Sequence, residues 1–140
     1  MIVLDTNVVS EVMKQTPTAR VLRWLAARPA GELFTTTITQ AEILYGLELL
    51  PQGKRRAALQ VAVEEMFGQD FAGRILPFDG DAAGMFARIA GARRRVGRPI
   101  AQFDAQVAAI ARSRGATVAT RNTSDFDDCG VTVVNPWSGP

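Results

Sequence analysis

The feature that most constrains the fold stands at the start of the chain, where three apolar residues run directly into an aspartate. Ile2, Val3 and Leu4 are followed by Asp5. A short apolar run rich in β-branched residues is typical of a strand buried on both faces of a parallel sheet. Asp5 would end this strand, and Asn7 can cap a helix over residues 8–13. Open parallel sheets bind their ligands at the carboxyl ends of the strands, which is where Asp5 would lie. Asp5 is therefore either a residue that binds such a ligand or only a turn or cap residue.

Length and composition predict one globular domain over residues 1–140. The chain has 140 residues, of which 47% are hydrophobic and 21% charged. This balance is typical of a folded domain with a substantial core. The apolar stretches are too short to span a membrane, and no basic and apolar leader precedes Asp5. We therefore expect a cytoplasmic protein.

Histidine is absent and cysteine occurs once, at Cys129. A single cysteine excludes an internal disulfide framework and a cysteine-rich zinc site. The lack of histidine excludes Ser-His-Asp triads and histidine-ligated metals. An enzyme with this composition would work with carboxylates, which suit hard cations such as Mg²⁺ or Mn²⁺.

The basic residues are grouped, although the net charge is only +2. One group is Lys54–Arg56, and the other comprises Arg88, the run 93–95 and Arg98. Such grouping indicates a polyanionic partner or, for either group alone, an ordinary solvated helix face.

Strand and helix patterns alternate along the chain. Strands are expected near residues 2–4, 33–37, 74–78, 117–120 and 131–134, and helices over 8–13, from Thr18, and over 39–50, 54–67, 79–95 and 100–114. Pro77 lacks an amide proton, which places the third strand at an edge, and Asp79 is expected to cap the helix after it. The fold class is therefore α/β, a three-layer α/β/α sandwich with a mainly parallel five-stranded sheet.

Two further acids follow or face the predicted sheet edge. Glu42 stands three residues after Thr39, the spacing of a capping box, and a cap cannot be distinguished from a ligand by this pattern. Asp104 borders a predicted core face that includes Ile100, Phe103, Val107 and Ile110. A carboxylate in that position needs a partner, either an arginine or the other acids at the edge.

Four acidic segments follow one another along the chain: Asp5-Thr6-Asn7, Thr39-Gln40-Ala41-Glu42, Phe103-Asp104-Ala105-Gln106 and Thr120-Arg121-Asn122-Thr123-Ser124-Asp125-Phe126. Taken in this order, they resemble the acidic motifs of PIN domains, most closely those of the VapC and FitB toxins. The resemblance covers the whole chain. It implies that Asp5 and Asp104 are the principal metal ligands and that Glu42 is the third acid, with Mg²⁺ or Mn²⁺ as the cofactor.

The fourth acidic position is open, because Asn122 stands where many members carry aspartate. Either Asp125 supplies the charge or Asn122 binds through its amide. Thr6 and Arg121 resemble residues that line the site.

The resemblance implies a toxin that hydrolyses RNA phosphodiester bonds and is restrained by a small DNA-binding antitoxin, with no membrane partner. It also implies a homodimer and a higher complex with the antitoxin on operator DNA. Trp24 and the leucine-rich helix 43–50 offer apolar surface for such contacts.

Other classes fit less well. A haloacid-dehalogenase-type phosphotransferase would need an acid at position 7, where Asn7 stands, and a response-regulator receiver would need an acidic pair after the first strand. The main alternative is a catalytically degenerate PIN-like module that binds a protein or nucleic acid without cleaving it.

Overall fold

A computed structural model of the chain describes residues 1–138. In chain order its elements are β1 (Ile2–Leu4), α1 (Thr6–Val12), α2 (Ala19–Ala26), η1 (Ala30–Glu32), β2 (Leu33–Thr36), α3 (Thr37–Glu48), α4 (Lys54–Glu65), η2 (Met66–Asp70), β3 (Ile75–Leu76), α5 (Gly80–Arg95), α6 (Gln102–Ser113), β4 (Thr117–Ala119), η3 (Thr123–Phe126) and β5 (Val133–Val134).

The five strands form one sheet in the order β3-β2-β1-β4-β5, and every neighbouring pair is parallel. The predicted α/β class is thus confirmed, and the third strand lies at an edge as Pro77 indicated. β1 is the central strand, and Leu4 pairs with Ala119 of β4. The carboxyl ends of β1 and β4 therefore lie side by side.

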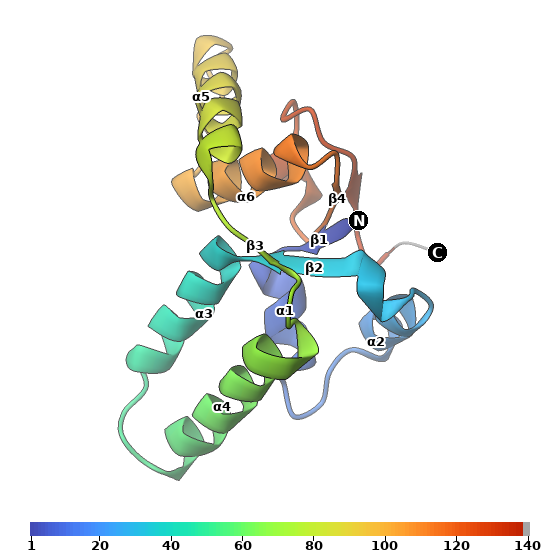
Figure 1. The fold of residues 1–140 in the computed structure, drawn as a ribbon, viewed down its shortest axis with the longest axis vertical. Coiled ribbons are helices and arrows are strands. Elements are labelled where there is room, and N and C mark those ends of the chain that lie inside the picture. Colours follow the sequence, from blue (N-terminus) through green and yellow to red (C-terminus); the bar gives the residue numbers. More distant parts are fainter. Residues whose placement is uncertain (139–140) are drawn as a thin grey trace.

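Helices cover both faces of the sheet (Figure 1). On one face, Val3 and Val118 pack with Ile89 of α5 and Ile110 of α6. On the other, Leu4 packs with residues of α1, α2, α3 and α4. Consecutive residues of β1 thus enter opposite cores, as expected for a strand buried on both faces.

Two local expectations are wrong. Helix α1 begins at Thr6, and its cap is Asp5, not Asn7. Helix α6 begins at Gln102, and Phe103, which was expected in the core, is 52% exposed. The core side of α6 is made largely of small residues (Ala105, Ala108, Ala109 and Ala111) together with Val107 and Ile110. The small alanine side chains let α6 pack closely against α5, and the bulky Phe103 in its first turn lies on the exposed side.

The apolar surface expected for assembly is only partly present. Trp24 is only 5% exposed and belongs to the core that contains Leu4 and Val8, which removes it from any docking surface. Leu44 and Tyr45 of α3, and Leu49 directly after it, are exposed. Among the helices of residues 1–138, none is long and apolar enough to cross a membrane.

Candidate active site

Asp5 holds the end of the central strand and the start of the first helix at the same time. Its amide donates to the Ala119 carbonyl at 2.9 Å, and its carboxylate accepts from the Thr6 amide at 2.9 Å. Only 6% of Asp5 is exposed. The cap and ligand interpretations of Asp5 therefore do not exclude each other, because one carboxylate oxygen caps the helix and the other faces Thr120.

Thr120 lies in the site, although the sequence indicated it only as the first residue of a motif. It follows β4 as Asp5 follows β1, and its buried hydroxyl donates to Asp5 Oδ2 at 2.9 Å. The Asn7 side-chain amide donates to Thr120 Oγ1 at 3.0 Å, while Asn7 Oδ1 accepts from the Arg121 amide at 3.1 Å. These bonds fix the Asp5 carboxylate. The sequence signal that could have identified Thr120 is its position directly after β4, the strand that pairs with β1.

Glu42 is not part of a capping box. Thr36 caps α3 by accepting from the Thr39 amide at 3.1 Å, which leaves no cap for Glu42 to complete. Instead, Glu42 Oε1 accepts from the Thr6 hydroxyl at 2.9 Å. The helix begins two residues earlier than the pattern predicted, and Glu42 therefore faces α1.

Asp104 lies in the first turn of α6 and is half-buried. No arginine lies within salt-bridge distance of it in the part of the chain that the structure describes, so the salt-bridge alternative is wrong, although the charge of Arg93 lowers its pKa from farther away. Burial, followed by the negative charges of Asp5, Asp125 and Glu42, raises the pKa of Asp104 to about 6. Those charges can act on Asp104 only because the four acids converge.

Asp125 is exposed on η3, and its charge raises the pKa of both Asp104 and Asp5. Asn122 precedes η3; its backbone amide donates to Thr120 Oγ1 at 3.2 Å, and its side chain does not cap η3. Of the two candidates for the fourth position, Asp125 is the one whose charge reaches the other acids.

The four acids form a repelling group. Burial is the main cause that raises the pKa of Asp5 and of Glu42, and each also feels another acid of the group, Asp125 and Asp5 respectively. Their donor atoms are all carboxylate oxygens, the set that Mg²⁺ and Mn²⁺ prefer. Within residues 1–138, however, no three Asp, Glu, Cys or His side chains already lie in a metal-holding arrangement. The chemistry of the group fits a hard cation, and binding would draw the carboxylates together.

The first group of basic residues lies away from the acids. Lys54 and Arg55 of α4 line a hollow of about 940 Å³ together with Lys14 and Met13. None of the four acids lines it. Nearer the acidic edge, the Arg121 guanidinium lies 5.1 Å from the ring centre of Trp137, a distance at which a cation and an aromatic face attract.

The sequence and fold match proteins of known class. A PIN domain model matches residues 2–130. The chain is 42% identical over 137 residues to a VapC ribonuclease, Y4jK, of Sinorhizobium fredii, covering 98% of both chains. It is 41% identical to the toxin FitB of Neisseria gonorrhoeae over 98% of this chain and 99% of that one. The solved structure of FitAB bound to an IR36 DNA fragment superposes with a TM-score of 0.93 at 40% identity, covering 100% of this chain and 98% of that chain. The chain therefore belongs to the PIN-domain family, in the group of the VapC and FitB toxins.

Proposed function

We propose that this protein is the toxic component of a toxin–antitoxin pair and acts as a Mg²⁺- or Mn²⁺-dependent endoribonuclease. The observation that carries the proposal is the convergence of Asp5, Glu42, Asp104 and Asp125 from four separate segments onto one sheet edge. Two carboxylates about 4 Å apart repel by roughly 4 kcal/mol at an effective dielectric constant of 20. A fold that gathers four of them with no salt bridge to Asp104 among the described residues favours a cation site over a structural role.

In this proposal Asp5 and Asp104 hold the metal ion, with Glu42 and Asp125 completing the acidic site. A bound divalent ion lowers the pKa of a water and stabilises charge on the scissile phosphate, which removes the need for histidine. Thr120 and the Thr6 amide keep the Asp5 carboxylate in one orientation, and the Thr6 hydroxyl does the same for Glu42. Such fixed orientation lowers the reorganisation that each turnover requires.

RNA is the substrate class that the proposal assigns, because the similar Y4jK protein is named a VapC ribonuclease. The partner we assign is a small DNA-binding antitoxin, since the similar FitAB complex was solved on DNA. A homodimer, a larger complex on operator DNA and a cytoplasmic location complete the proposal.

The test is cleavage of RNA by the purified protein freed from any antitoxin, with Mn²⁺ and with EDTA. We expect cleavage only with the cation, and its loss in Asp5→Asn and Asp104→Asn. Asp81→Asn, an exposed carboxylate in the first turn of α5, is the matched control and should cleave as the wild type does. RNA binding without cleavage would instead support the non-catalytic module, and wild-type activity in Asp5→Asn would refute the mechanism.

A further inference from the structure

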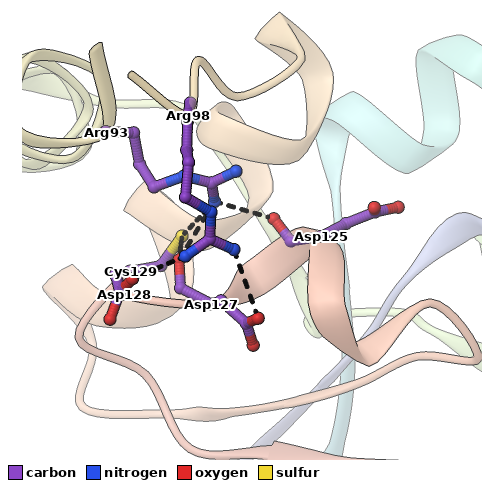
Figure 2. A network of polar contacts seen from close by, with 6 residues as sticks. All are labelled: Arg93, Arg98, Asp125, Asp127, Asp128 and Cys129. Carbon is purple, nitrogen blue, oxygen red and sulfur yellow. Dashed lines mark hydrogen bonds and ion pairs between the residues drawn. The ribbon is translucent and has the colours of Figure 1, made fainter. Parts of the chain in front are cut away.

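Arg93 is a buried cation whose guanidinium contacts the loop that carries Asp125. It lies in the last turn of α5 and is 6% exposed. Its Nε donates to the Arg98 carbonyl at 2.7 Å, and its Nη1 donates to the carbonyls of Asp125 at 3.1 Å and Asp127 at 3.0 Å. One guanidinium thus joins the turn after α5 to the loop that carries Asp125 (Figure 2).

No carboxylate forms a salt bridge with this guanidinium within residues 1–138, although its charge lowers the pKa of Asp104 from beyond salt-bridge distance. The carboxylates of Asp127 and Asp128 pair with Arg98 instead, at 3.3 and 3.0 Å, near the surface. A buried charge that has lost its hydration and contacts three carbonyls and a thiol, but no carboxylate, is a poor source of stability. The buried Arg93 is better explained by its contacts with the loop that carries Asp125, whose position it fixes, than by a gain in stability.

The orientation of Asp125 supports this reason. Figure 2 shows its carbonyl facing Arg93 while its carboxylate points away from the guanidinium. The charge of that carboxylate acts on Asp5 and Asp104. Arg93 therefore holds the backbone of Asp125 without pairing with the acid itself.

We propose that Arg93 is a positioning residue, whose guanidinium clamps the backbone of residues 125–127 and so fixes the place of the Asp125 carboxylate among the other acids. This inference rests on the proposed nuclease function. It relies on the planar fork of arginine, because Nε and Nη1 donate from two separate positions in fixed directions, whereas an ammonium group donates from one atom. Arg93 itself contacts none of the reacting groups.

Cys129 provides a built-in reporter of the clamp. It is the single cysteine of the chain, it is 1% exposed, and its Sγ lies 3.8 Å from Arg93 Nη1. A thiol reagent can reach it only when the loop opens. The charge of Arg93 lowers the pKa of this thiol, against a larger rise caused by burial. Loss of Arg93 would therefore make the closed thiol less reactive, so a faster reaction must come from loop opening.

The first measurement is the rate at which the native protein reacts with dithionitrobenzoate. Arg93→Met should raise this rate about tenfold or more, and Arg93→Lys should raise it as well, because a lysine lacks the two separate donor nitrogens and the rigid geometry of the guanidinium. Arg94→Met, the exposed neighbour on the same helix, should leave the rate unchanged. If Arg93→Met fails to fold, Arg93→Lys carries the test alone. Wild-type rates in both Arg93 variants would overturn the clamp.

The second measurement is a double-mutant cycle on RNA cleavage with Arg93→Lys and Asp125→Asn. Misplacement of the acid should lower kcat on the order of tenfold to a hundredfold with KM for RNA little changed. If Arg93 acts through Asp125, the double variant should be no slower than Asp125→Asn alone. Additive losses in an active enzyme would overturn this inference and leave the proposed function standing, whereas a wild-type protein that cleaves no RNA would overturn both.

Discussion

The Thr6 hydroxyl donates a hydrogen bond of 2.9 Å to Glu42 Oε1 and approaches Thr39 Oγ1 at 3.1 Å, which joins the first turn of α1 to α3. These residues are 36 and 33 positions from Thr6 in the chain. The contact aims Glu42 toward the same strand edge as Asp5, whose charge raises the Glu42 pKa after the larger effect of burial. Glu42, which the sequence pattern suggested as part of a helix cap, is thereby placed near Asp5.

Glu42→Gln should abolish or strongly reduce RNA cleavage while changing stability by less than about 1 kcal/mol, since the glutamine oxygen can still accept from Thr6. Denaturant unfolding and a cleavage assay on the same preparation measure both effects. A variant that keeps full activity would show that Glu42 only ties α1 to α3. Thr6→Val is the companion variant; it removes the hydrogen bond but keeps the carboxylate, so a partial loss of activity is expected.

A divalent cation should raise the melting temperature of the antitoxin-free protein. A ligand that binds the folded site alone stabilises it by about 2.7 kcal/mol at a hundredfold excess over Kd. That corresponds to a shift of several degrees for a chain of this size. Thermal melts with EDTA and with Mn²⁺ measure the shift. Asp104→Asn should lose most of it, and its cation-free melting temperature should rise because one repelling charge is gone. An equal response in both proteins would argue against a site at Asp104.

The pKa of Asp104 predicts how the cation-free protein responds to pH. Its folded value of about 6 lies above the ordinary 3.8, so the folded state holds the proton more tightly than the unfolded chain. The stability that this proton contributes is complete below pH 3.8 and is lost as pH rises toward 6. Asp104→Asn should remove that decline, and denaturant unfolding between pH 4 and 7 measures it. Because Asp104 is half-exposed, the effect should be modest.

Thr120→Val should destabilise the protein by about 1–3 kcal/mol, because the buried Asp5 carboxylate and the Asn7 amide both lose a partner. The pKa of Asp5 should rise further, since the Thr120 hydroxyl now lowers it. Thr117→Val, at the partly exposed start of β4, the strand that Thr120 follows, is the control and should reduce stability little. Urea unfolding of the two variants makes the comparison; equal stabilities would contradict a special role for Thr120.

The protein should be a homodimer at micromolar concentration. Exposed apolar residues that an interface could use include Leu44 and Tyr45 of α3 and Leu49, which directly follows that helix. Light scattering of the wild type and of Tyr45→Glu measures the assembly. We expect the charge to shift the variant toward monomer; a monomeric wild type would refute the prediction.

Several elements could be predicted because their signals are local. The apolar run before Asp5, the edge position of Pro77 and the cap at Asp79, whose carboxylate accepts from the Ala82 amide at 3.0 Å, depend on neighbouring residues only. The start of α3 was placed wrongly because Thr36, Thr37 and Thr39 all have cap-forming hydroxyls, and local spacing does not choose among them. Phe103 was assigned to the core because helical spacing locates a face without showing how closely a neighbouring helix packs on it.

The sequence by itself determined that a buried strand of a parallel sheet ends at Asp5, since strand periodicity and the polarity of the next residue are encoded over a few positions. Tertiary structure alone decided how the acids of the site are held. Thr120 meets Asp5 across 115 residues, and Arg93 meets the Asp125 carbonyl across 32. Hydrogen bonds over such separations depend on strand register and helix packing, so the partners of each acid become definite only when the whole sheet and its two helical layers are in place.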